Sequence, residues 1–157
     1  MISVGDSIPA ATITVITKDG QDNVSAADFF AGKKVVLFAL PGAFTPTCSE
    51  AHLPSFVVKH DDITAKGVDS VACLSVNDAF VMKAWQTAQN AENLTMIADG
   101  GGALTQAMDL VLSTGDFGGD RSQRYSMIVD NGTITHLNVE EGGGYEVSDA
   151  DTILKQL

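Results

Sequence analysis

The feature that most constrains this chain is a short apolar run, residues 35–40, that leads directly into Pro-Gly-Ala-Phe-Thr-Pro-Thr-Cys-Ser-Glu at residues 41–50. A run that is apolar at every position predicts a central strand covered by helices on both faces. Residues 52–60 predict a helix. The chain must therefore turn sharply from a buried strand into a helix, and Cys48 falls in the first turn of that helix.

The start of this helix has two possible registers. In one, Thr45 is the N-cap and Pro46 occupies the first helical position, which proline favours. In the other, Thr47 is the N-cap and Glu50 completes a capping box. Both registers put Cys48 where backbone N–H groups point outward and stabilise negative charge, which favours a thiolate. Position alone fits an inert, buried cysteine equally well.

Composition narrows the class of protein. The chain has 157 residues, 45% of them hydrophobic and 18% charged, which predicts one globular domain spanning residues 1–157. A net charge of −11 repels nucleic acid and anionic lipid, so neither is an expected partner. The apolar runs are too short to span a bilayer, and the N-terminus lacks the basic and apolar stretches of a signal peptide. We therefore expect a cytoplasmic protein.

Apolar periodicity and turn residues predict strands that alternate with helices, followed by a hairpin and a final helix. Asn77 and Asp78 are expected to cap one helix, and Asn131-Gly132 to form the hairpin turn. The Gly-rich residues 113–123 are expected to form a loop. This order predicts an α/β protein with a thioredoxin-like fold, in which helices flank a mixed central sheet. The expected strands are residues 11–16, 34–40, 68–76, 94–98, 125–130 and 133–139, and the expected helices are residues 25–32, 52–60, 79–91, 103–108 and 148–157.

The two cysteines, Cys48 and Cys73, form no disulfide framework, and with the three histidines they form no metal-ligand pattern. We accordingly expect neither a metal nor a cofactor. Cys73 lies inside a predicted buried strand and is expected to be a core residue. His52 follows Cys48 by one helical turn and could approach the thiol or a partner subunit, but a surface or packing role is favoured.

Residues 41–48 match the P-x-x-x-T-x-x-C signature of the peroxiredoxins. The longer stretch 38–54 resembles the type II, or peroxiredoxin 5, subfamily, and residues 71–81 and 124–129 are similar to that subfamily as well. Together with the order of elements, the resemblance covers nearly the whole chain. It implies a thioredoxin-like fold, thiol peroxidase activity on hydroperoxides, and a homodimer.

The resemblance also implies roles for particular residues. By it, Cys48 is the peroxidatic cysteine, Thr45 and Pro41 complete its loop, and Arg124 is the active-site arginine. A surface ion pair is the ordinary role of an arginine in so acidic a chain, but Arg121 and Arg124 are the only arginines, and the match to the family favours catalysis for Arg124. The residues expected to support the substrate pocket are Pro41, Gly42, Phe44 and Arg121.

The expected chemistry is attack by a thiolate on one oxygen of a hydroperoxide, which gives a sulfenic acid and releases water or an alcohol. If the pKa of a thiol falls from about 8.5 to about 6, its thiolate fraction at pH 7 rises about thirtyfold, while its nucleophilicity falls about tenfold. The net gain is only a few-fold. Hydrogen-bond donors aimed at the oxygens should therefore supply more of the rate. The candidates are the Arg124 guanidinium, the Thr45 hydroxyl and the Cys48 N–H.

The lack of a cysteine near the C-terminus bears on how the oxidised Cys48 returns to the thiol. Members of the subfamily that close an intramolecular disulfide use a second cysteine near the C-terminus, and residues 142–157 contain none. A bridge to Cys73 is not expected, because it requires α-carbons within about 7 Å. The sequence thus predicts a one-Cys mechanism without a resolving cysteine, in which glutathione, glutaredoxin or thioredoxin restores the thiol. Two other functions stay open: a redox-sensing binding module, and a cysteine hydrolase with a histidine base.

Overall fold

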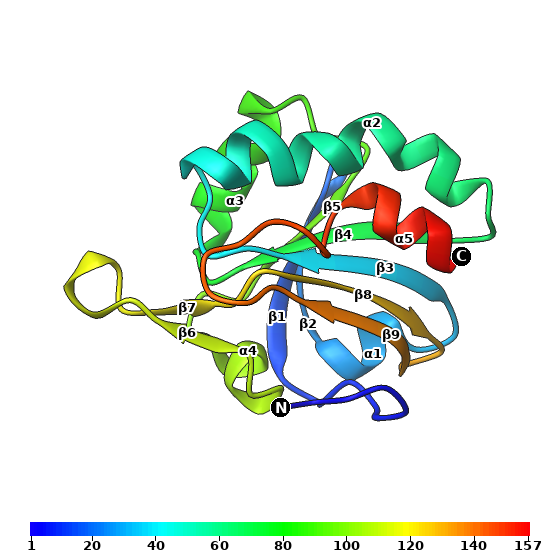
Figure 1. Ribbon diagram of the computed structural model, residues 1–157, viewed down its shortest axis with the longest axis horizontal. Helices are drawn as coiled ribbons and strands as arrows, with labels where there is room; N and C mark the ends of the chain where they lie inside the picture. Colours follow the sequence, from blue (N-terminus) through cyan, green and yellow to red (C-terminus); the bar gives the residue numbers. More distant parts are fainter.

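The computed structural model describes residues 1–157 and is built around one seven-stranded mixed sheet (Figure 1). Its strands are β1 (Thr12–Thr17), β2 (Gly20–Ser25), β3 (Lys34–Ala39), β4 (Ser70–Ser75), β5 (Thr95–Ala98), β8 (Tyr125–Asp130) and β9 (Thr133–Val139). Their order across the sheet is β2-β1-β5-β4-β3-β8-β9. The three central strands β3, β4 and β5 run parallel, and the remaining strands join them antiparallel on either side.

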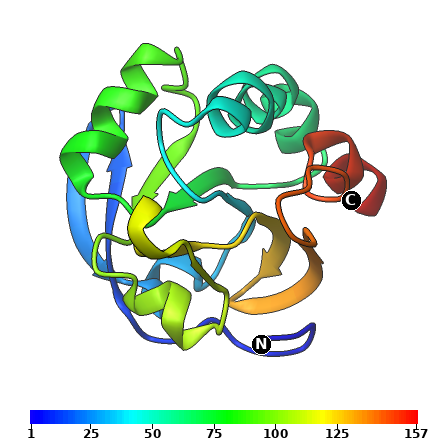
Figure 2. The ribbon, with the colours of Figure 1, turned by 60° about the vertical axis from the view of Figure 1, so that its left-hand side comes forward.

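Helices cover both faces of this sheet (Figure 2). Those on one face are α2 (Leu53–Thr64), α3 (Ala79–Ala88) and α5 (Ala150–Gln156), and those on the other are α1 (Ala26–Phe30) and α4 (Ala103–Ala107). Along β3, Val36 and Phe38 join the core beneath α2, whereas Val35 and Leu37 join the core beside α1. All four are fully buried, which confirms the prediction of a strand covered on both faces.

Strand β2 is absent from the sequence prediction. Its residues are Gly-Gln-Asp-Asn-Val-Ser, and the first four are exposed, so the strand shows no apolar alternation. It lies at the edge of the sheet and is held by main-chain pairing to β1 across the turn at residues 18–19. A polar edge strand of this kind carries no signal in its side chains.

The Gly-rich residues 113–123, expected to form a loop, are largely structured. The strands β6 (Val111–Ser113) and β7 (Asp120–Ser122) pair in a small hairpin with a 3₁₀ turn, Gly115–Phe117, at its tip. This hairpin projects from the body of the molecule (Figure 1). The expectation of a loop is wrong because strands of three residues are too short to show a periodic pattern.

The structure confirms the helix cap predicted at Asp78 and the hairpin turn predicted at Asn131-Gly132. The side chain of Asp78 accepts a hydrogen bond from the N–H of Val81 at 2.9 Å and caps α3. Asn131 and Gly132 have φ angles of 49° and 79°, as the tight turn between β8 and β9 requires. The remaining predicted elements are present with ends that differ by a few residues. None of the helices is both long and apolar enough to cross a bilayer.

Candidate active site

The candidate site begins in the loop that follows β3. Pro41 lies half-buried at the exit from the strand, and the hydroxyl of Thr45 closes the loop by donating to the carbonyl of Gly42 at 2.7 Å. The side-chain oxygen of Asn77 accepts from the N–H of Ala43 at 3.1 Å and ties the loop to the end of β4. A Cβ on Gly42 would lie 3.2 Å from the methyl group of Thr45. Glycine therefore allows the loop to close this tightly.

The helix after the loop starts in the first of the two predicted registers. The N–H of Ser49 donates to the carbonyl of Thr45 at 2.9 Å, and Pro46 is the first helical residue. Thr47 already has helical backbone angles, and its side chain caps nothing, so the alternative register is wrong. Cys48 lies in the first turn, as both registers predict.

This first turn is wider than an α-helical turn. Residues Cys48–His52 form a π-helical turn, in which the N–H of Leu53 donates to the carbonyl of Cys48. Pro54 has no N–H to bond the carbonyl of Glu50, so the α-helical pattern is interrupted here. Such turns are frequent at functional sites. In this one, Cys48 and His52 both face the same arginine.

That arginine, Arg124, reaches the turn from the sheet. The next residue, Tyr125, pairs with Ala39 at the end of β3, so the register of β3 and β8 places Arg124 beside the exit to the loop. Its Nη2 donates to Cys48 Sγ at 3.1 Å. Cys48 is only 1% exposed, so little water reaches this contact. The structure thus joins the two residues on which the sequence prediction depends.

His52 holds the other side of the guanidinium. Its Nδ1 lies 2.9 Å from Arg124 Nη1, and its Nε2 lies 2.9 Å from the carbonyl oxygen of Ser148. Because an arginine only donates, Nδ1 must accept, and the ring proton must then be on Nε2. Burial, followed by the charge of Arg124, lowers the pKa of His52 to about 3. The ring is therefore neutral.

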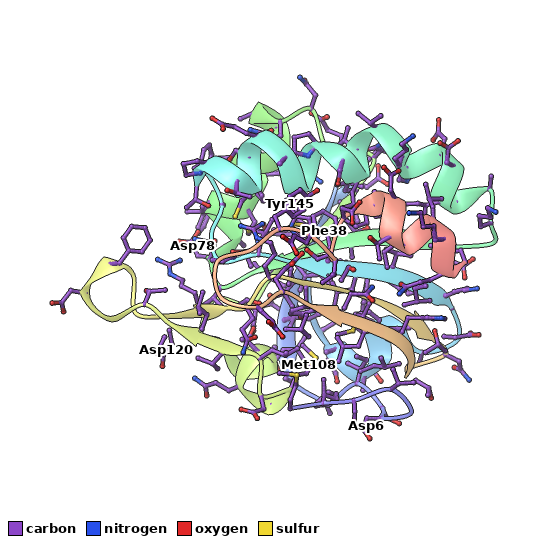
Figure 3. All side chains as sticks on the ribbon, viewed as in Figure 1. Asp6, Phe38, Asp78, Met108, Asp120 and Tyr145 are labelled. Carbon is purple, nitrogen blue, oxygen red and sulfur yellow. The ribbon has the colours of Figure 1, made fainter.

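The role expected for His52 is corrected by this geometry. The side chain is fully buried, and its ring centroid lies 5.0 Å from that of Phe38 and 5.2 Å from that of Tyr145. Both of these neighbours are labelled in Figure 3, beneath α2. A surface position is wrong, and packing is only part of its role, since it also orients Arg124. The spacing of four residues from Cys48 was the one signal in the sequence. Since both ring nitrogens are engaged elsewhere, His52 is not a general base for the thiol, which argues against the cysteine hydrolase.

Phe44 is exposed on the loop, whereas the neighbouring ring of Trp85 is fully buried. Phe44 is 56% exposed and has a φ angle of 65°, which is uncommon for a residue other than glycine. Its ring centroid lies 6.4 Å from that of Trp85. The indole Nε1 of Trp85 donates to Ser49 Oγ at 3.0 Å, directly after Cys48. As the only tryptophan of the chain, Trp85 provides a fluorescence signal from the first turn.

Arg121 does not join the contacts around the sulfur. Its guanidinium donates to the carbonyls of Gly118 and Val76 at 2.8 and 3.0 Å. The first bond lies within the hairpin of β6 and β7, and the second ties this hairpin to the end of β4. Of the two arginines singled out from the sequence, only Arg124 contacts Cys48.

Cys73 is a core residue, as predicted. It lies fully buried on β4, opposite Phe38 of β3, and both cysteines are free. Burial, and after it the charge of Cys48, raises the pKa of the Cys73 thiol well above its usual value, against a smaller opposing effect of Arg124. Nowhere in the structure do three or more His, Cys, Asp or Glu side chains converge as metal ligands would.

Known proteins resemble this chain in sequence and in fold. The family model described as Redoxin matches residues 3–154. Over 159 aligned residues the chain is 46% identical to peroxiredoxin-2D of Arabidopsis thaliana, covering 99% of this chain and 98% of that protein. It superimposes on reduced Prx3 of Vibrio vulnificus in complex with H₂O₂ with a TM-score of 0.96, at 57% identity and over 99% of both chains. For peroxiredoxin 5 of Alvinella pompejana the TM-score is 0.86 and the identity 30%, over 99% of this chain and 97% of the other.

Proposed function

Because this chain belongs to the redoxin family and is a peroxiredoxin with a thioredoxin-like fold, we propose that it reduces hydrogen peroxide and alkyl hydroperoxides by a one-Cys mechanism at Cys48. Thiol peroxidase activity follows from the family. We propose three further points: that Cys48 is the reacting cysteine, that the mechanism uses only this one cysteine, and that hydrogen peroxide and alkyl hydroperoxides are the substrates. The observation that carries it is the 3.1 Å contact between Arg124 Nη2 and Cys48 Sγ, in a site where Cys73 is buried in the sheet.

In the first step the thiolate sulfur of Cys48 attacks the nearer oxygen of the hydroperoxide. An S–O bond forms, the O–O bond breaks, and the other oxygen leaves with the electron pair of that bond and takes up a proton as water or an alcohol. The sulfur is oxidised to sulfenic acid and the peroxide is reduced. Negative charge therefore moves from the sulfur to the departing oxygen during this step.

Arg124 and Thr45 are suited to opposite parts of the substrate. The guanidinium already donates to the sulfur, so its N–H groups lie where the peroxide oxygens must arrive and where charge develops. The Thr45 hydroxyl donates its hydrogen bond to the carbonyl of Gly42. The hydroxyl oxygen of Thr45 can therefore accept the proton of the hydroperoxide. A hydroperoxide has one proton and two adjacent oxygens. Its proton can therefore bond the Thr45 oxygen while its oxygens accept from Arg124.

The second step needs a thiol from outside the chain. Residues 142–157 contain no cysteine, and the raised pKa of Cys73 keeps that thiol protonated and unreactive within β4. An external thiol attacks the sulfenic acid, giving a mixed disulfide and water, and a second thiol releases Cys48. With Cys48 only 1% exposed, the first turn of the helix must open before a bulky thiol can reach the sulfur. Glutathione, glutaredoxin and thioredoxin are the proposed reductants.

A homodimer and a cytoplasmic location stay predictions. The exposed ring of Phe44 beside the site, and the ring of Phe80 at 83% exposure in α3, support an interface between two copies near this end of the molecule. Sedimentation of the reduced protein measures the association directly.

The proposal is tested by mixing reduced protein with hydrogen peroxide in a stopped-flow instrument and following the fluorescence of Trp85. Oxidation of the reactive thiol should appear as a fast change in fluorescence. Cys48→Ser should abolish this change, whereas Cys73→Ser should retain it. Mass spectrometry after one equivalent of peroxide should show a sulfenic acid on Cys48, and a mixed disulfide once glutathione is added. A Cys48–Cys73 disulfide would contradict the one-Cys mechanism. Oxidation without steady-state turnover on a thiol would indicate a redox sensor instead.

A further inference from the structure

A buried polar network lies behind the site, between β9 and α5. Glu140 follows β9 directly and is only 6% exposed. Its carboxylate accepts hydrogen bonds from the N–H groups of Glu146, Val147 and Ser148 at 2.8–2.9 Å, and from the hydroxyl of Ser148 at 2.6 Å. One side chain therefore holds the whole turn that precedes α5.

The same turn reaches Arg124 by two routes. Through side chains, the carbonyl of Ser148 bonds His52 Nε2, and His52 Nδ1 bonds the guanidinium of Arg124. Through the main chain, the N–H of Glu140 donates to the carbonyl of Arg124 at 2.9 Å, as an extension of the pairing between β8 and β9. These contacts form a closed ring in which Glu140 bonds Arg124 directly through the main chain and indirectly through Ser148 and His52.

We propose that Glu140 is a positioning residue of the peroxidatic site, which fixes the Ser148 carbonyl so that His52 keeps its proton on Nε2 and aims Arg124 at Cys48. If the carbonyl moves away, Nε2–H loses its acceptor, and the tautomer with the proton on Nδ1 becomes more populated. That tautomer presents a donor to a guanidinium that has only donors. The guanidinium must then turn away, and the sulfur loses its partner.

The chemistry of each group suits this role. Every polar neighbour of the Glu140 carboxylate is a donor, so only an ionised carboxylate satisfies all of them. Burial opposes the charge, but the hydrogen bonds from Ser148, Glu146 and Val147 outweigh burial and hold the pKa of Glu140 below its usual value. The ring of His52 stays neutral and has one proton to place, so a fixed carbonyl on one side decides which nitrogen faces Arg124.

The first test uses Glu140→Gln, which keeps the shape of the side chain but turns an amide NH₂ toward N–H donors. The second-order rate of Cys48 oxidation by hydrogen peroxide should fall about tenfold, the size expected when one bond that aims a charged donor is lost. The matched control is Asp99→Asn. Asp99 is 1% exposed and also accepts two main-chain bonds, from Leu104 and Thr105, but it bonds no residue of the site. Its variant should lose stability and keep the oxidation rate.

A double-mutant cycle separates positioning from a general loss of stability. If Glu140 acts through His52, adding Glu140→Gln to His52→Ala should change the oxidation rate by less than twofold. Effects that multiply in the double variant would overturn the proposal, as would a wild-type rate in Glu140→Gln alone.

A measurement on the unaltered protein keeps the proposal testable if these variants fold poorly. The ¹⁵N shifts of the His52 ring should show a proton on Nε2 and none on Nδ1. In Glu140→Gln the same shifts should move toward a mixture of tautomers, which a merely structural role would not produce. A proton on Nδ1 in the wild-type protein would refute the chain of contacts from Glu140 to Cys48.

Discussion

Replacing Arg124 with alanine should slow the oxidation of Cys48 by hydrogen peroxide about 10²–10³-fold, the range for loss of one donor to a developing charge. The structure gives two reasons for a value within this range. Nη2 donates to Sγ at 3.1 Å in a site where the sulfur is 1% exposed, so little water is present to replace it. A charge-assisted bond of about 1.5–3 kcal/mol alone corresponds to about 10–150-fold, and further N–H groups serve the departing oxygen.

Stopped-flow fluorescence of Trp85, with peroxide in excess, gives the second-order rate constant from the dependence on peroxide concentration. Arg121→Ala is the matched control, since its guanidinium bonds only the carbonyls of Gly118 and Val76. This variant should lose some stability and keep the oxidation rate within about twofold of wild type. The reasoning is refuted if Arg124→Ala also stays within threefold of wild type, or if the two alanine variants are equally slow.

Three further predictions concern the pH dependence of stability, the closure of the loop before Cys48, and the role of Cys73. Because the pKa of His52 is about 3 in the folded protein and about 6.5 when unfolded, the unfolded chain binds this proton first as the pH falls. This group should lower the free energy of unfolding by about 1.6 kcal/mol in total between pH 6.5 and 5, and urea titrations of His52→Gln should lack this contribution. Gly42→Ala places a Cβ 3.2 Å from Thr45 and should slow oxidation about tenfold in stopped flow, whereas Gly143→Ala meets no atom within 4 Å and should not. Cys73→Ser should turn over peroxide with glutathione as fast as wild type in a coupled assay, and a slower rate would give Cys73 a redox role.

The parts of the fold that the sequence predicted are those with a local physical cause. The apolar run of β3 needs cover on both faces, Asp78 caps α3 with its own carboxylate, and Asn131-Gly132 adopts the positive φ angles that few other residues tolerate. The edge strand β2 and the hairpin of β6 and β7 were missed because main-chain pairing holds them, and such pairing leaves no pattern in the side chains.

The candidate site also has parts that the sequence could predict and parts that it could not. The loop to Cys48 is continuous in sequence, so its spacing carries information, and the scarcity of arginine drew attention to Arg124. The environment of His52 is made by a carbonyl 96 residues away and a guanidinium 72 residues away, and neither can be inferred from the spacing on one helix. The hydroxyl of Thr45 was expected to donate to the peroxide oxygens, yet it donates its proton to the carbonyl of Gly42 within the loop.

The charge of Arg124 is available to the sulfur because its other partner is neutral. The chain has 20 acidic residues, but neither the ion pair of Met1 with Asp109 nor the contact of His60 with Asp61 involves this arginine. His52 fixes the guanidinium through a lone pair and carries no charge of its own, so it orients Arg124 without neutralising it. The uncompensated positive charge beside a buried sulfur stabilises the negative charge that develops on the departing oxygen during the reaction. A histidine kept neutral by burial is therefore as necessary to this arrangement as the arginine that it holds.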